Sequence, residues 1–528
     1  MERKWWTLIA VSVAIFMLLL DITVVNVALP SIQSALKSSF SDLQWVVNAY
    51  ALTLAAFLLT AGSVADLIGR RRVFTLGLIV FTASSAVCGL STTPLMLNLA
   101  RAVQGVGGAM MFSTSLALVA QAFHGRERGT AFGVFGAVTG AAVAIGPVVG
   151  GIITSGIGWK WIFFINVPIG IAAVAITLSR VVESRDPDAR RVDWIGLVTF
   201  SGALFMLVFA LIEGNEDGWG STKIVSLLLG ALILFVAFIT AELKQSRPML
   251  DLSLFRKPAF TGASIVAFSV SASIFAMFLY LTLYIQDVLG YTALQAGLRF
   301  LPITLLSFVV APIAGRLSVR MPVRYLLGGG LLLVSAGLLG MTAIDSTSGW
   351  TTLIPGFALA GAGVGMINPP LASTAIGVVH YSRSGMASGI NSTFRQVGIA
   401  TGIAGLGAVF QHDVLQTTTS SLGGRLSAVQ AAAHGHLNTL LQSGEVKQVF
   451  HALPPAAQLA LKHSYRVGFT EAFDHILLIA AGIAFVGALL ALVLVRQRDF
   501  VASHLPATEP STEGAAPPST EPQSVGAH

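Results

Sequence analysis

The chain has 528 residues, of which 54% are hydrophobic and 10% are charged, and its formal net charge is +7 at pH 7. Ordinary soluble domains carry about 25% charged residues, so this composition excludes that class of protein. Cys88 is the only cysteine in the sequence, which excludes an internal disulfide and a cysteine-based metal cluster.

Apolar runs of about twenty residues recur along the whole chain, and each is long enough to cross the ~30 Å hydrocarbon core as a helix. Backbone polar groups in lipid must be satisfied within the segment, which predicts an all-α polytopic membrane protein. The first run is too long for a signal peptide and no cleavage site follows it, so we expect it to remain as a span. The fourteen predicted spans lie near residues 8–30, 43–64, 73–92, 95–121, 129–153, 161–181, 193–213, 221–242, 259–287, 295–318, 324–345, 351–377, 386–411 and 475–496.

The distribution of basic residues predicts the orientation, because Lys and Arg accumulate in cytoplasmic loops. With the N-terminus inside, 21 of the 31 Lys and Arg residues fall on the cytoplasmic side, 7 fall outside and 3 fall within spans. This asymmetry predicts a multi-pass protein of the plasma (inner) membrane with both termini in the cytoplasm. The net positive charge is then a topology signal beside anionic lipid, and no nucleic-acid partner is expected.

The first span contains a carboxylate in the stretch LLLDITVVNVALP, where Asp21 precedes Pro30 by nine residues. A charge at this depth costs on the order of 3 kcal/mol by insertion scales, so it needs a partner or a polar cavity. Arg101, in the fourth span, lies at a similar depth. Burial favours the neutral carboxyl and a nearby guanidinium favours the carboxylate. We therefore predict a pair, either a static ion pair or a proton-exchange site, and we favour the second.

The sequence also repeats itself. RGTAFGVFG at 128–136 matches SGMASGINS at 384–392, and QGVGGAM at 104–110 matches AGAGVGM at 360–366, both at an offset of 256. Such repeats predict two six-helix bundles with two additional central spans, a transporter architecture. The predicted boundaries are 1–182 for the N-terminal bundle, 183–257 for the linker with two extra spans, 258–498 for the C-terminal bundle with a long extracellular loop at 412–474, and 499–528 for a disordered cytoplasmic tail.

Other polar groups along the spans have two readings each. Asn26, in the first span, is either a contact between helices or a substrate contact. Arg395 and Gln396, in the thirteenth span, either line a cavity or bond to a neighbouring helix, and Gln104 is a further cavity candidate. The histidines of the 412–474 loop include His434 and His436, but no acidic cluster or cysteine accompanies them, so no metal site is expected.

Five segments together resemble the signature set of the major facilitator superfamily, and more narrowly its fourteen-span drug:proton antiporters, the EmrB/QacA group. The resemblance covers about residues 5–411 and 475–498. The segments are DITVVNVALP in span one, GSVADLIGRRR after span two, RAVQGVGGA in span four, GAAVAIGPVVGG in span five and WKWIFFINVPIG at the start of span six.

This resemblance implies roles for the residues that carry it. Asp21 and Arg101 are expected to couple transport to protons. A cytoplasmic gate, closed when the cavity faces outward, is expected at Gly62, Asp66, Gly69, Arg70 and Arg71. An antiporter motif, which is also a tight seam of small residues, is expected at Gly140, Gly146, Pro147, Gly150 and Gly151.

The expected function is proton-coupled export of lipophilic drugs or antibiotics by alternating access. The alternative is a proton-coupled uptake symporter for a small organic solute. The glycine–proline motif and the fourteen predicted spans argue against this alternative. The sequence has no G-x-S-x-G, H-x-x-E-H or G-x-x-x-x-G-K-[ST] motif, so we expect neither an enzyme nor an ATP-driven pump. The expected partners are the substrate, protons and the bilayer, with the proton gradient in place of a cofactor; an accessory export protein is left open.

Overall fold

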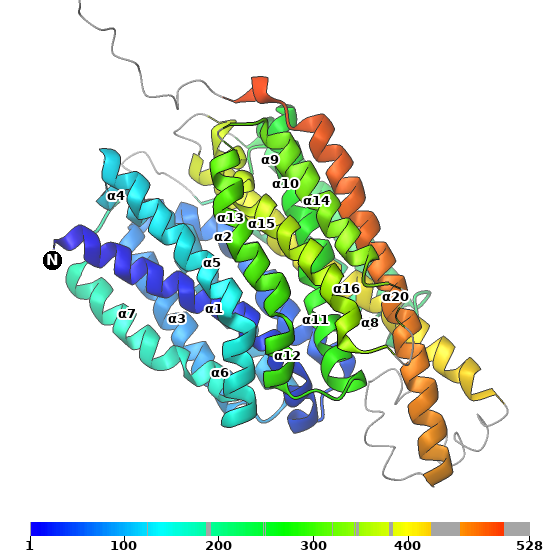
Figure 1. Cartoon of the computed structure of the whole chain (residues 1–528). Helices are drawn as coiled ribbons and strands as arrows, with labels where there is room; N and C mark the ends of the chain where they lie inside the picture. Colours follow the sequence, from blue (N-terminus) through cyan, green and yellow to red (C-terminus); the bar gives the residue numbers. More distant parts are fainter. Residues whose placement is uncertain are drawn as a thin grey trace, which may run out of the picture.

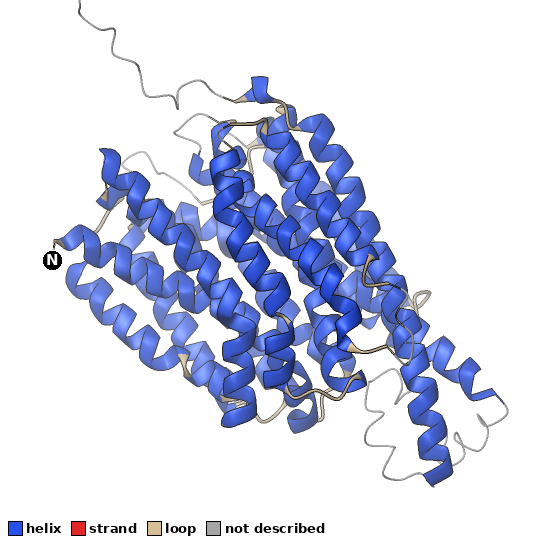
Figure 2. Cartoon of the chain, viewed as in Figure 1, coloured by secondary structure: helices blue, strands red, loops and turns tan. Residues whose placement is uncertain are grey.

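The structure is a computed structural model that describes residues 2–123, 125–185, 192–245, 248, 250–318, 320–342, 344, 348–379, 384–423 and 455–500. These residues form helices and connecting loops, and no strand occurs among them (Figure 2). Three short 3-10 helices, η1 (Leu252–Arg256), η4 (Trp350–Leu353) and η7 (Gln497–Asp499), lie at or near the ends of longer helices. The all-α prediction is confirmed.

The first half of the chain folds into a bundle (Figure 1). Local signals start its helices: Ser39 and Asp42 form a capping box, and Thr93 caps a helix whose first residue is Pro94. The elements are α1 (Arg3–Leu36), α2 (Phe40–Ile68), α3 (Arg70–Leu90), α4 (Pro94–Ala122), α5 (Gly125–Gly156), α6 (Trp161–Phe164) and α7 (Asn166–Arg180).

Two helices follow, α8 (Trp194–Asp217) and α9 (Thr222–Lys244), and they pack against each other. The α8 side chains Leu204 and Val208 share an apolar cluster with Ala51 of α2 and Ala400 of the later helix α16. Because α2 belongs to the first half and α16 to the second, α8 covers a seam between the halves.

The second half forms another bundle. One long span contains two π-helical turns, in which backbone hydrogen bonds join residues five apart in place of four. Its elements are α10 (Pro258–Val270), the π-helices η2 (Ser271–Phe275) and η3 (Tyr284–Val288) on either side of α11 (Ala276–Leu283), α12 (Ala293–Arg299), α13 (Leu301–Leu317), α14 (Val323–Leu339), α15 (Ile354–Gly377), α16 (Ser384–Leu422) and α20 (Pro455–Leu494).

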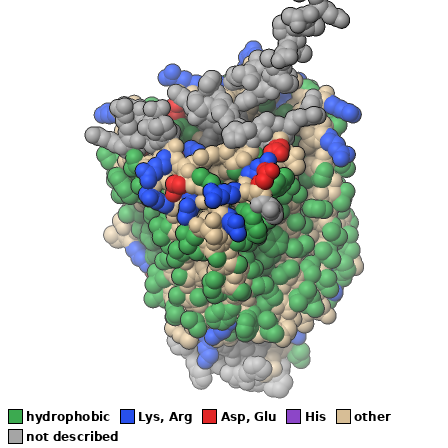
Figure 3. All heavy atoms as spheres, turned by 90° about the vertical axis from the view of Figure 1, so that its left-hand side faces the viewer, with side chains coloured by type: hydrophobic (Ala, Val, Ile, Leu, Met, Phe, Trp, Pro, Cys, Tyr) green, Lys and Arg blue, Asp and Glu red, His purple; other side chains and the backbone are tan. Residues whose placement is uncertain are grey.

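Each predicted span coincides with a described helix or with consecutive helical segments. Twelve of these are long and apolar enough to cross a membrane, whereas α14 is apolar but only 17 residues long and α16 lies outside the set of twelve. The number fourteen therefore stays a prediction. Figure 3 shows hydrophobic side chains around the middle of one face, with Lys and Arg gathered near one end, the pattern expected of a bilayer-embedded protein.

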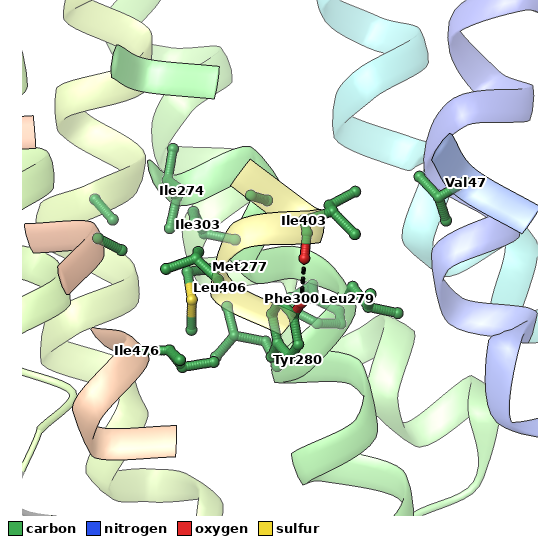
Figure 4. Packing of buried hydrophobic residues seen from close by; sticks show 14 of the residues in the cluster. Val47, Ile274, Met277, Leu279, Tyr280, Phe300, Ile303, Ile403, Leu406 and Ile476 are labelled. Carbon is green, nitrogen blue, oxygen red and sulfur yellow. Dashed lines mark hydrogen bonds between the residues drawn. The ribbon is translucent and has the colours of Figure 1, made fainter. Parts of the chain in front are cut away.

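The largest apolar cluster of the described residues lies mostly in the second half and encloses the hydroxyl of Tyr280. The hydroxyl of Tyr280 donates to the carbonyl of Ile403 over 2.6 Å, and Met277, Phe300 and Leu406 pack around this bond (Figure 4). The phenol thus ties α11 to α16, because a buried hydroxyl without a partner would destabilise the fold.

The halves meet at the ends of the helices that we expect to face outward. Gln286 donates to the carbonyl of Val27 over 2.8 Å, and the Leu294 N–H donates to the Ser155 hydroxyl over 2.9 Å. Toward the other end α5 diverges from α13 (Figure 1), and a Cβ placed on Gly133 would have no neighbour within 4 Å. The structure is thus closed at the expected outer end.

The structure describes parts of two predicted segments, and the domain boundaries themselves stay predictions. The loop expected over 412–474 is helical at both ends, because α16 continues to Leu422 and α20 already begins at Pro455. Of the tail expected over 499–528, only Asp499 and Phe500 are described, and Phe500 packs against an apolar cluster that includes Leu59 of α2, Phe238 of α9 and Phe260 of α10. The remainder of both segments, residues 424–454 and 501–528, lies outside the described residues, as do His434 and His436.

Candidate proton-coupling site and gate motif

Asp21 and Arg101 form a buried ion pair. Helix α1 carries the carboxylate and the antiparallel helix α4 carries the guanidinium, at depths that match. The distance from Arg101 Nη1 to Asp21 Oδ2 is 2.5 Å. Asp21 is 2% exposed and Arg101 is 1% exposed. The pairing predicted from depth is therefore present. Its role in proton exchange stays a prediction.

Two amides complete the surroundings of the carboxylate. Gln104 donates to Asp21 Oδ1 over 3.0 Å, and Asn166 donates to the same oxygen over 3.2 Å. Arg101 in turn donates to Gln104 over 2.8 Å and to the carbonyl of Val46 over 3.0 Å. The carboxylate thus has donors on both oxygens, which compensates its removal from water. Gln104, predicted as a cavity residue, belongs to this cluster instead.

An outer layer of residues holds the cluster in place. Asn166 also donates to the Ser85 hydroxyl over 3.0 Å, and that hydroxyl donates to the carbonyl of Phe163 over 2.9 Å. The guanidinium carbon of Arg101 lies 4.3 Å from the centroid of the Tyr50 ring, within the range of a cation–π contact. Both contacts restrict the orientation of the charged groups.

Asn166 and Ser85 were missed from the sequence. Asn166 is the first residue of α7, in the stretch WKWIFFINVPIG, where it is the only amide among apolar residues. That isolation was a usable signal, because a lone amide deep in an apolar run needs a partner. Ser85 gave no comparable signal, since a serine in a span usually bonds to its own helix.

The cluster lies entirely within the first half. Its members come from α1, α2, α3, α4 and the start of α7, and no described residue of the second half contacts Asp21 by a hydrogen bond or ion pair. Two residues further along α1, Thr23 turns toward α5. A change at Asp21 can reach the second half through α1 and α5. A second route runs through α2, because the Val46 carbonyl accepts from Arg101 and Gln44 donates to the carbonyl of Ile403 in α16.

The predicted antiporter motif makes the connection through α1 and α5. A Cβ on Gly146 would overlap the Thr23 side chain, and one on Gly150 would lie 2.9 Å from the carbonyl oxygen of Val24, so α5 lies directly on α1. A Cβ on Gly151 would lie 2.7 Å from the carbonyl oxygen of Ala293 in α12.

The other two motif residues lie along the same helix. The carbonyl oxygen of Pro147 approaches Gly297 of α12, while Gly140 is more open, with Phe308 of α13 at 3.8 Å from a built Cβ. The close helix contacts of the motif are thus confined to its outer half, from Gly146 to Gly151.

The predicted gate motif joins α2 to α3 at the opposite end of the bundle. Gly69 has φ 122°, a conformation that L side chains rarely adopt, and this allows the sharp turn. Asp66 accepts from Arg70 Nε over 2.9 Å within the same motif. Gly62 lies beside Ser113 of α4, 3.8 Å from a built Cβ.

Glu183, just after α7, is a second acid of this motif that sequence reasoning missed. Its carboxylate accepts from the Arg71 backbone N–H over 3.0 Å and lies 3.7 Å from Arg72 Nε. Arg71 also donates through Nη2 to the carbonyl of Leu178. Among the described residues, all of these contacts stay within the first half. The role of this motif as a cytoplasmic gate stays a prediction.

The remaining candidates lie apart from the cluster. Asn26 donates to the carbonyl of Ile22 on its own helix over 3.4 Å. Arg395 donates to Asn368 of α15 over 3.1 Å, and its guanidinium lies 5.8 Å from the Phe275 ring centroid. Gln396 is half-buried on the same helix. Arg395 therefore bonds to a neighbouring helix, one of its two predicted readings.

Comparison with known proteins decides the family. Residues 11–403 match the family model described as Major Facilitator Superfamily. The chain belongs to the major facilitator superfamily. It is therefore a multi-span membrane transporter and not an enzyme.

Curated relatives and a solved structure agree with this. The chain is 38% identical over 404 residues to the multidrug resistance protein Stp of Mycobacterium tuberculosis (strain CDC 1551 / Oshkosh), which covers 76% of this chain and 75% of that protein. It is 33% identical to the tetracenomycin C resistance and export protein of Streptomyces glaucescens, over 78% of this chain and 77% of that protein.

Among solved structures, the fold is similar to that of a bacterial homologue of the human lysosomal transporter Spinster in an inward-facing, unoccupied conformation. The TM-score is 0.60 at 18% identity, covering 95% of this chain and 99% of that chain. At this identity the likeness concerns the fold alone.

Proposed function

We propose that this transporter exports lipophilic drugs or antibiotics across the plasma membrane in exchange for protons. The named relatives support drug export as the direction and the class of cargo. The observation that carries the proton coupling is the buried cluster of Asp21, Arg101, Gln104 and Asn166, which places a single titratable acid among fixed donors inside one bundle.

The mechanism follows from what protonation does to this cluster. A neutral Asp21 no longer attracts the Arg101 guanidinium as a carboxylate does. Protonation therefore changes the free energy of the arrangement in which α1 lies against α4. Thr23 and Val24 transmit that change to Gly146 and Gly150 of α5, and α5 lies on α12 of the second half. A proton shifts the equilibrium between the two orientations of the halves only if it binds one orientation more tightly than the other.

The test uses everted membrane vesicles with an imposed proton gradient, acidic inside. Addition of a transported cationic dye or hydrophobic antibiotic to the outside is expected to dissipate the gradient for an antiporter. Asp21→Asn is expected to abolish this response while the protein is still expressed and folded. Asp217→Asn is the matched control, because Asp217 is a peripheral acid that pairs with Lys223 at the far end of α8, away from the cluster.

The uptake symporter gives a different result in the same assay. Solute added outside everted vesicles would then leave the inward-acid gradient in place or increase it. Unimpaired gradient dissipation and drug resistance in Asp21→Asn would refute the role of this acid, whichever direction transport takes.

A further inference from the structure

A cavity of about 470 Å³ lies between the start of α14 and the end of α20. Both helix ends lie on the side that the charge distribution predicts to be cytoplasmic. Three of its six lining residues are arginines. The lining is Pro322, Arg324, Val493, Arg496, Gln497 and Arg498.

The positive charge of this cavity is not balanced from within the described part of the chain. None of the three guanidinium groups takes part in an ion pair there. Arg324 donates to the Tyr325 hydroxyl over 2.8 Å, and its Nε is buried without an acceptor among the described residues. Asp499, which follows Arg498 in the sequence, accepts from the Ala259 N–H over 3.1 Å and keeps its negative charge, so the three arginines still leave a net positive charge.

The start of α14 adds to this potential, whereas the end of α20, with its partial negative charge, opposes it. The N-terminus of α14 carries a partial positive charge, and its N-cap residue Pro322 supplies no side-chain acceptor. Arg324 lies in that first turn, where a cation is disfavoured by the helix dipole. An anion bound between the guanidinium groups and the first turn of α14 would reduce this repulsion, as phosphates do at other helix N-termini.

The surroundings select the kind of anion. Directly beside the arginines, Val493 is 62% exposed and Tyr325 is 45% exposed, and further along α20 Leu489 is 47% exposed. An apolar strip thus leads from the arginines toward the membrane interior. The narrow approach of the two helices, with Leu492 against Gly328, closes the cavity on its inner side.

We infer that this cavity, here called the arginine cavity, binds the phosphate head group of an anionic phospholipid of the cytoplasmic leaflet. Arginine forks match phosphate oxygens in bidentate geometry. The acyl chains would lie along the exposed face of α20 below it. Basic pockets between helices on the cytoplasmic side are suited to such head groups. This inference is independent of the transport direction and of Asp21.

The test is equilibrium binding of short-chain phosphatidylglycerol to the purified full chain in detergent, with phosphatidylcholine and inorganic phosphate as comparison probes. Each arginine beside an anionic head group contributes about fivefold to affinity. The triple variant R324Q/R496Q/R498Q is therefore expected to bind phosphatidylglycerol on the order of a hundredfold more weakly. The matched control R180Q/R256Q/R316Q removes three arginines from the same side of the membrane outside the cavity and is expected to bind as the unchanged chain does.

The outcomes separate clearly. Equal loss of binding in the two triple variants would overturn the inference, since it would reflect net charge alone. Complete competition by millimolar inorganic phosphate would also overturn it, because the cavity would then take free phosphate. If the glutamine variant does not fold, R324K/R496K/R498K keeps the charge but loses the fork geometry, and unchanged affinity in that variant would count against the site.

Discussion

The two bundles treat equivalent positions in opposite ways. At the repeat offset of 256, Arg101 of α4 corresponds to Phe357 of α15, and Gln104 corresponds to Ala360. In the first half this position holds the ion pair with Asp21, whereas Phe357 and Ala360 are completely buried in the largest apolar cluster. Equivalent positions of the repeat thus hold a polar network in the first bundle and apolar packing in the second. This asymmetry suggests that the first bundle carries the proton chemistry.

The largest effect is expected from breaking the ion pair on one side. Arg101→Leu leaves Asp21 buried without its cation, and such losses cost about 3–5 kcal/mol. Thermal unfolding of the purified protein would measure this, together with transport. The double variant Asp21→Asn/Arg101→Leu is expected to recover part of the stability but no transport.

The corresponding change in the second half has a different signature. Phe357→Ala removes a buried ring and is expected to cost about 3–5 kcal/mol through the cavity left behind. The pH dependence of transport, measured on protein that remains folded, is expected to stay unchanged. A shifted pH profile in Phe357→Ala would show that the proton chemistry is not confined to the first bundle.

The junction between the bundles can be tested at Gly151. A side chain there would meet the backbone of Ala293 in α12, so Gly151→Val is expected to prevent closure of the outer end and reduce transport more than tenfold (on the order of 1.4 kcal/mol or more). Cysteine accessibility from outside at nearby residues would report the open end. Gly156→Val, at a glycine with no neighbour within 4 Å of a built Cβ, is the control.

A smaller effect is expected at the edge of the cluster. Asn166→Leu removes one donor to Asp21 while keeping the ion pair, which corresponds to about 1.5–3 kcal/mol for a hydrogen bond to a charged group. The pH profile of transport should therefore move toward higher pH, since the protonated acid gains relative to the carboxylate. A profile identical to that of the unchanged protein would mean that Asn166 only holds Ser85.

The sequence made the Asp21–Arg101 pair predictable because charged residues are so rare in the spans. The all-α class and the helix positions followed from hydropathy, whereas the two bundles followed from the internal repeat and the family resemblance. Asn166 was missed although its isolation in an apolar run was a signal, whereas Glu183 was missed because its importance depends on the helix end that packs beside it. Helices α16 and α20 continue beyond the predicted spans because the Gln, Ser and Ala residues there are polar enough to end a membrane segment but still favour a helix.

These two extensions have a mechanical consequence. Helix α20 has 40 residues, a length of about 60 Å, roughly twice the hydrocarbon thickness. Contacts of Asp413 with His475 and of Ser421 with Ser464 hold it against α16 beyond the spans. The two helices thus form a rigid extension of the second bundle. A small tilt of this bundle therefore produces a large displacement at the far end of the helix pair. A fluorophore near Leu459 would convert each turnover into a displacement large enough to follow in single molecules.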